Sequence, residues 1–200
     1  SDIGFHDTAA WWFWQTKLKG FTVFDYDQAI GLDADDWIPR LRKRLDKNNI
    51  KAPNLGRIYL PVDAKARTFQ SKYSAMERFL ASFGASKIEI TPSVKIKDRI
   101  NSARVVARRC EFNKIPCEQG LDGLRAWSFE FNDETGDLSK EPKHDWTSHP
   151  GDAYSYGAQV LEEFIPKDTT PEPERAVAVF HNTARLNDLW EDTPKRSWRI

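Results

Sequence analysis

The sequence predicts an α/β domain with a mixed central sheet flanked by helices. Two observations favour this fold. Segments with the two-residue alternation or the continuous apolar character of strands are interspersed with segments in which apolar residues recur at helical spacing. A polar stretch, residues 129–146, then interrupts the pattern, which predicts a hairpin or loop insertion before the last core helix.

The first part of the chain predicts an antiparallel hairpin followed by a helix. Residues 8–14 form an apolar run rich in Trp, residues 17–20 have the character of a turn, and residues 21–26 alternate apolar and polar side chains. Asp33 is a suitable N-terminal cap for the helix that follows, and Asn48 marks its end.

Strands and helices are predicted to alternate between residues 57 and 127. In order, these are a strand at 57–62, a helix from Ser71 to a C-terminal cap at Gly84, a strand at 87–91, a helix opened by Asp98 and a weaker helix at 120–127. In the helix opened by Asp98, the shared apolar face comprises Ile100, Ala103, Ala107 and Cys110, so Arg99 is expected off that face.

The last core helix is predicted to begin near Pro150, which suits the first position of a helix. Beyond Pro166 the composition shifts to Asp, Thr, Pro and Glu. The predicted organisation is therefore one domain at residues 1–165 and a linker with a C-terminal tail at residues 166–200.

The composition argues against a membrane protein, a secreted protein and a structural zinc protein. No apolar stretch approaches the roughly 18 residues that cross a bilayer, so no membrane association is expected. The N-terminus also lacks the basic and apolar regions of a secretory signal. The two cysteines, Cys110 and Cys117, make no disulfide framework, which indicates a reducing cytoplasm, and their spacing does not suit structural zinc.

The zero net charge conceals a basic region. Residues 37–114 hold nineteen Lys and Arg against six Asp and Glu. One basic face could therefore meet a polyanion, unless acidic segments interleave with it in space. The candidates for contacts with DNA phosphates are Arg40, Arg42, Lys43, Arg44, Arg99, Arg104 and Arg108, although a solvated helix face explains each of them nearly as well.

Three acidic residues occupy similar predicted positions. Asp2 lies at the start of a strand, Asp63 at the end of another, and Asp152 in the first turn of a helix. If the strands are neighbours and the helix packs across them, the three carboxylates converge at one edge of the sheet. Such a cluster suits Mg²⁺ or Mn²⁺, which prefer oxygen ligands, and two such ions can promote phosphodiester hydrolysis.

Each acid also has a structural interpretation. Asp2 could be a solvated chain end, Asp63 could start a turn, and Asp152 could favour the helix dipole. Periodicity and composition do not decide between these interpretations.

Three stretches together resemble the C-terminal nuclease domain of the large terminase subunit of tailed bacteriophages. Residues 2–9 (DIGFHDTA) are similar to the opening strand of that family, residues 59–64 (YLPVDA) to its second acidic strand end, and residues 144–153 (HDWTSHPGDA) to the segment that leads into its final helix. The third stretch is the most specific, and the resemblance spans about residues 1–165.

The resemblance implies an RNase H-like fold and a metal-dependent endonuclease that cuts concatemeric double-stranded viral DNA during genome packaging. It implies that Asp2, Asp63 and Asp152 hold Mg²⁺ or Mn²⁺, with two ions expected. His149, three residues before Asp152, would serve as a further ligand or proton carrier, or else as a helix cap.

The resemblance also implies partners and a location. These are an upstream ATPase domain of the same full-length protein, a small terminase subunit and a portal protein, in the host cytoplasm. The ATPase signature G-x-x-x-x-G-K-[S/T] does not occur in these residues, so no motor activity is expected of them.

Two alternative functions stay open. One is another RNase H-like nuclease such as a junction resolvase, and the other is a non-catalytic docking domain that contacts portal or capsid through the tail.

Overall fold

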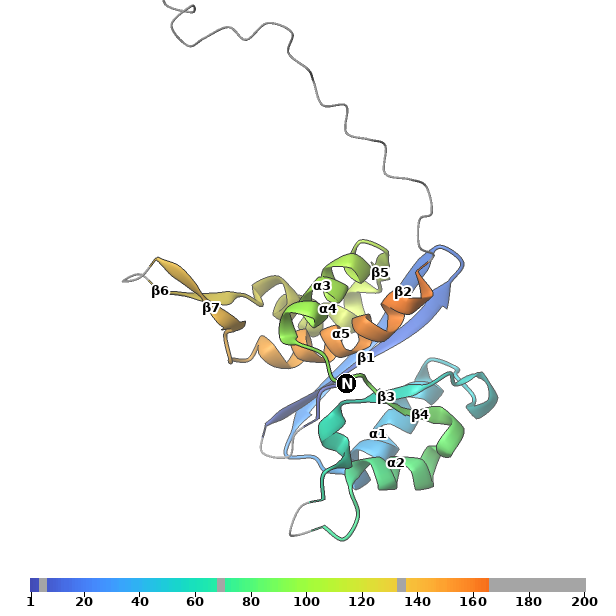
Figure 1. Cartoon of the computed structure of the whole chain (residues 1–200). Helices are drawn as coiled ribbons and strands as arrows, with labels where there is room; N and C mark the ends of the chain where they lie inside the picture. The colour runs from blue at the N-terminus through green and yellow to red at the C-terminus, as the bar shows by residue number, and fades with distance from the viewer. Residues whose placement is uncertain (4–6, 68–70, 133–135, 166–200) are drawn as a thin grey trace, which may run out of the picture. The chain divides into compact units, whose positions relative to one another are not determined.

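Figure 1 shows a computed structural model of the chain, which describes residues 1–3, 7–67, 71–132 and 136–165. The predicted tail at residues 166–200, and residues 133–135 of the predicted insertion, lie outside the described residues. The boundary between domain and tail stays a prediction.

A long antiparallel hairpin forms the centre of the described fold. β1 (Thr8–Lys17) pairs with β2 (Gly20–Ile30) along its whole length, as the aromatic run and the turn predict. A third strand, β5 (Cys110–Phe112), pairs in parallel with β2. The sequence did not predict β5, because Cys110 continues the helical spacing of the preceding apolar residues.

The N-terminal segment connects this sheet to a second, parallel pair of strands, β3 (Ile58–Leu60) and β4 (Ile88–Ile90). Asp2 and Ala10 exchange two backbone hydrogen bonds of 2.9 Å, and the Oγ of Ser1 donates to the carbonyl of Tyr59. Residues 1–3 therefore lie between β1 and β3, where Figure 1 marks the N-terminus. Asp2 does not start a regular strand as predicted, because its pairing is an isolated bridge.

Five helices of the described chain cover the strands. They are α1 (Ala34–Lys47), α2 (Ala75–Phe83), α3 (Ile96–Ala107), α4 (Lys114–Ala126) and α5 (Ser148–Leu161). Single 3-10 turns occur at Ala52–Asn54, Val62–Lys65, Ala85–Lys87 and Glu162–Phe164. In the part of the chain that the structure describes, no helix has the length and apolar character needed to span a bilayer.

The predicted insertion before the last helix is a hairpin. Its strands are β6 (Phe129–Asn132) and β7 (Asp137–Pro142), paired antiparallel. In Figure 1 this hairpin projects away from the packed helices.

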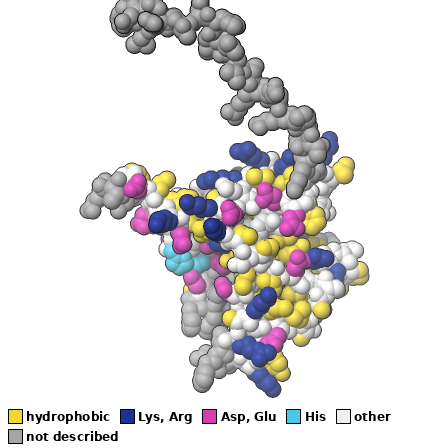
Figure 2. All heavy atoms as spheres, viewed as in Figure 1, with side chains coloured by type: hydrophobic (Ala, Val, Ile, Leu, Met, Phe, Trp, Pro, Cys, Tyr) yellow, Lys and Arg dark blue, Asp and Glu magenta, His cyan; other side chains and the backbone are white. Residues whose placement is uncertain are grey.

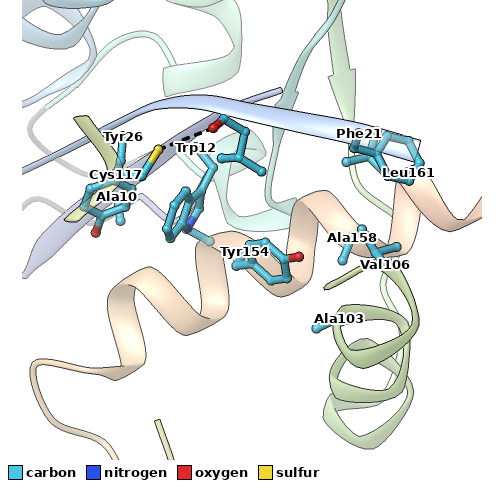
Figure 3. Packing of buried hydrophobic residues seen from close by; sticks show 12 residues of the cluster. Ala10, Trp12, Phe21, Tyr26, Ala103, Val106, Cys117, Tyr154, Ala158 and Leu161 are labelled. Carbon is cyan, nitrogen blue, oxygen red and sulfur yellow. Dashed lines mark hydrogen bonds between the residues drawn. The ribbon is translucent and has the colours of Figure 1, made fainter. Parts of the chain in front are cut away.

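Residues 9–12 of β1 are buried on both faces of the sheet, which explains the continuous apolar run. Ala10 and Trp12 pack into one core with side chains of α3, α4 and α5. Ala9 and Trp11 pack into a second core with side chains of α1 and α2. Figure 3 shows the first core, in which Tyr154 of α5 lies beside Trp12.

Four helix starts differ from the prediction. The first residue of α3 is Ile96 rather than Asp98, and α4 begins at Lys114 rather than at Gly120. The cap of α2 is Ser74 rather than Ser71, because Ser74 and Glu77 form a reciprocal capping box. The first residue of α5 is Ser148, so Pro150 is its third residue, where a missing backbone N–H still costs no hydrogen bond. For α2 and for α5 the sequence contains more than one suitable first residue within a few positions, and the prediction chose the wrong one.

The buried face of α3 also differs. Val106 is buried, whereas Ala107 is exposed and Cys110 belongs to β5. Arg99, predicted off the apolar face, is buried. A buried positive charge requires a negative partner, and Asp152 of α5 provides it.

Two buried aspartates of β2 tie the hairpin to α1. Arg40 donates two hydrogen bonds of 2.6 Å to Asp27, and Arg44 donates to both Asp25 and Asp27. Asn48 donates a further bond to Asp25. Burial alone would raise the pKa of Asp27, but the hydrogen bonds from Arg40 and Arg44 lower it overall. The carboxylate of Asp27 therefore stays ionised, and the hydrogen bonds to both aspartates hold α1 on the sheet.

We predict that Asp27→Ala lowers the free energy of unfolding by about 3 kcal/mol, because one partner of a buried ion pair is lost while Arg44 keeps its charge. Lys43→Ala, at an exposed position of the same helix, is expected to change it by less than about 0.5 kcal/mol. Urea unfolding at neutral pH measures both. Equal effects of the two substitutions would contradict the structural role of this ion pair.

Candidate active site

Asp2 is held at the junction of the two pairs of strands. Its backbone pairs with Ala10 of β1, and the preceding residue contacts β3. The side chain is 26% exposed, so one carboxylate lies half-buried at this junction. The next residue, Ile3, packs against the core formed with α1 and α2, which helps to hold Asp2 in this position.

The first turn of α5 is fixed against the same region of β1. The indole Nε1 of Trp12 donates to the carbonyl of Pro150 at 2.9 Å, in the protein interior. Asp145 accepts hydrogen bonds from the backbone N–H and the hydroxyl of Thr147, which shapes the approach to the helix. These contacts bring His149 and Asp152 to the N-terminal segment.

His149 lies between two aspartates. Its Nε2 is 3.1 Å from Asp7, and its Nδ1 is 3.8 Å from Asp2. The second histidine of the segment, His144, lies 3.7 Å from the other oxygen of Asp7. Thr147 takes the N-cap position of α5, so the interpretation of His149 as the helix cap is wrong. Figure 2 shows histidine side chains among acidic and basic ones on this face.

Asp2 and Asp152 influence each other's ionisation. Burial, and then the negative charge of Asp152, raise the pKa of Asp2 to about 6. Burial likewise raises the pKa of Asp152, and the positive charge of Arg99 opposes that rise. Two carboxylates that are costly to ionise together form a site where a bound cation would be stabilising.

Asp63 approaches this cluster less closely. It lies in the 3-10 turn Val62–Lys65 directly after β3, as predicted, and its side chain is exposed. Within the described residues, its carboxylate makes no hydrogen bond or ion pair. Burial raises the pKa of Tyr156, and the negative charges of Asp152, Asp2 and Asp63 add to that rise. The negative charge of Asp63 therefore reaches Tyr156, although no hydrogen bond or ion pair within the described residues joins Asp63 to α5.

The arrangement is an incomplete set of metal ligands. Among residues 1–3, 7–67, 71–132 and 136–165, no three His, Cys, Asp or Glu side chains stand close enough together to hold an ion. The donor chemistry nevertheless fits a divalent cation, since Asp2 and Asp152 offer oxygen ligands at one half-buried place. Asp63 would have to move closer to join them.

The predicted DNA contacts divide into two groups. Several of these side chains have partners within the protein: Arg40 and Arg44 bind the aspartates of β2, Arg42 bonds to Ser82, and Arg99 bonds to Asp152. Lys43, Arg104 and Arg108 are exposed on α1 and at the end of α3. The exposed group stays a prediction for phosphate contact.

Three further residues belong to the cluster. Asp7, from the first motif, lies between both histidines. His144 opens the third motif, and Tyr156 follows Asp152 by one helical turn. That four-residue spacing is the signal that sequence reasoning missed for Tyr156.

Comparison with solved structures identifies the class of fold. The chain has the RNase H-like fold of large terminase nuclease domains, as the sequence motifs imply. It aligns with the large terminase of a thermophilic bacteriophage at a TM-score of 0.61 and 12% identity, over 80% of this chain. It spans 38% of the length of that protein.

A second similar structure is the nuclease domain of the large terminase from bacteriophage SPP1, solved with bound Mn. The TM-score is 0.56 and the identity 13%, and the alignment covers 82% of each chain. At such low identity the likeness establishes the fold alone. No protein-family model and no curated protein matches the sequence.

We predict that Gly151→Ala destabilises the site by about 1–3 kcal/mol, because an added Cβ would lie 2.4 Å from the ring of Trp127 and force the start of α5 to shift. Gly56→Ala is the matched control, since nothing lies within 4 Å of a Cβ there. Urea unfolding of both variants tests this. A neutral Gly151→Ala would show that the start of α5 is loosely packed.

Proposed function

We propose that this chain is a divalent-metal-dependent endonuclease that cleaves double-stranded DNA. The observation that carries the proposal is the placement of Asp2 and Asp152, from opposite ends of the described chain, in one half-buried cluster. The shared fold with the terminase nuclease domain of SPP1, which was solved with Mn, supports the choice of reaction.

In this proposal Asp2, Asp63 and Asp152 hold Mg²⁺ or Mn²⁺, with two ions expected. Such ions promote attack of water on a phosphodiester and stabilise the leaving oxygen. The half-buried position of Asp2 and Asp152 limits competition from solvent. His149, which lies beside Asp2 and Asp7, orients these carboxylates or carries a proton at its Nε2.

The proposed biological role is the cutting of concatemeric viral DNA during phage genome packaging, in the host cytoplasm. Exposed Lys43, Arg104 and Arg108 would contact DNA phosphates. The full-length protein would also carry an ATPase domain before these residues, and it would act with a small terminase subunit and a portal protein. The similarity to part of the large terminase of the thermophilic phage supports this placement within a longer protein.

We predict that Asp152→Asn and Asp63→Ala each reduce Mn²⁺-dependent cleavage of supercoiled plasmid by roughly 100-fold or more. Losing a ligand should cost at least as much as losing a residue that only orients one, which costs about 10–100-fold. Asp122→Asn, at an exposed aspartate of α4, is the control and should cleave normally. Circular dichroism verifies that each variant is folded.

Wild-type cleavage by either variant would refute the site. If the wild-type protein cleaves four-way junctions in preference to linear duplex, it is a junction resolvase rather than a packaging nuclease. If it binds no Mn²⁺ in calorimetry and associates with a portal protein, the docking function replaces the enzymatic one.

A further inference from the structure

Arg99 is a buried cation within the carboxylate cluster. It is the fourth residue of α3 and is 8% exposed, which is unusual for an arginine. The neighbouring arginine of this helix, Arg104, is exposed. The burial of Arg99 therefore reflects a specific partner rather than the general position of α3.

That partner is α5. The Nη2 of Arg99 donates to Oδ1 of Asp152 at 3.2 Å, and its guanidinium carbon lies 4.1 Å from the centre of the Tyr156 ring. Asp152 and Tyr156 are one helical turn apart, so both lie on the same face of α5. Asp152 accepts a hydrogen bond from the edge of the guanidinium, and the ring of Tyr156 stacks on its plane. The ion pair and the stacking hold the group in place.

The guanidinium is only partly compensated. Its Nη1 is buried and has no hydrogen-bond partner within the described residues. Only one oxygen of Asp152 is engaged by Arg99, so Oδ2 is left for another ligand. The charge of Arg99 also reaches Asp2, whose pKa it lowers against the larger effects of burial and Asp152.

We infer that Arg99 is an internal counter-cation of this site, which stabilises Asp152 in the absence of metal and weakens the binding of the divalent cation beside it. This inference rests on the proposed function. Arg99 acts through Asp152 and is a positioning residue, since no reacting group contacts it in the structure.

Electrostatics gives the direction of the effect. A divalent ion held by Asp152 would lie close to the guanidinium of Arg99, which the ion pair and the stacking on Tyr156 hold against the same carboxylate. Like charges at that distance repel strongly in a partly buried environment. A purely structural arginine would have the opposite effect, because its loss would disorder Asp152 and weaken metal binding.

The test compares three variants of the chain by titration calorimetry with MnCl₂. Arg99→Met removes the charge and keeps an apolar stem, and it should bind Mn²⁺ roughly tenfold more tightly than wild type. Arg99→Lys keeps a positive charge beside Asp152, so its affinity should lie closer to that of wild type than the affinity of Arg99→Met does. Lys97→Met, at an exposed position of α3, should leave the affinity unchanged.

A second measurement guards against failure of Arg99→Met to fold. In metal-free buffer with EDTA, Arg99→Met and Arg99→Gln should both lower the Tm, because each leaves the carboxylate of Asp152 uncompensated. Adding Asp152→Asn to either variant should recover part of the loss. Complete additivity of the two substitutions would show that the ion pair contributes nothing.

The outcomes separate the two proposals. If wild type binds Mn²⁺ and Arg99→Met binds no more tightly, the role of Arg99 is overturned while the metal site survives. If wild type binds no Mn²⁺, the proposed function and the effect of Arg99 on metal both fail.

Discussion

The convergence of two half-buried carboxylates, Asp2 and Asp152, is the interaction on which the site depends. Neither residue is held by the other. The backbone of Asp2 is fixed by Ala10, and α5 is fixed by the hydrogen bond from Trp12 to Pro150. Both anchors belong to β1, so this strand determines how close the two acids come.

The protein contains two sets of buried acids with different compensation. Asp25 and Asp27 receive hydrogen bonds from two arginines and an asparagine, and the pKa of Asp27 is lowered. Asp2 and Asp152 are compensated less: Arg99 bonds to Asp152 alone, His149 lies 3.8 Å from Asp2, and the pKa values of both acids are raised. Full compensation is typical of a structural network, whereas incomplete compensation is typical of a site that awaits a ligand.

The sequence predicted the order and type of the long elements because their apolar periodicity is strong. The hairpin of β1 and β2, the capped helix α1 and the inserted hairpin β6–β7 are all confirmed. Strand β5 was missed because Cys110 continues the helical spacing of the apolar residues before it. The position of Asp2 was only approximately predicted, because an isolated bridge leaves no periodic signal.

The site was predictable only as a set of separated acids. Their approach depends on long-range packing, which no local pattern encodes. Arg99 illustrates the limit: helical spacing placed it off the apolar face, yet the ion pair with Asp152 draws it inside. Likewise, Arg40 and Arg44 have the sequence character of a basic surface and instead bind buried acids of β2.

The two faces of β1 pack into two different hydrophobic cores, so this strand separates the cores and contributes side chains to both. Trp11 stacks on Phe79 on one side, and the adjacent Trp12 contacts Tyr154 on the other. Because neighbouring residues of a strand cannot rotate independently, a change of volume in either core is transmitted to the opposite one. The helices α1 and α2, which pack on the other side of β1 from α5, are thereby mechanically connected to the geometry of the candidate ligands on α5.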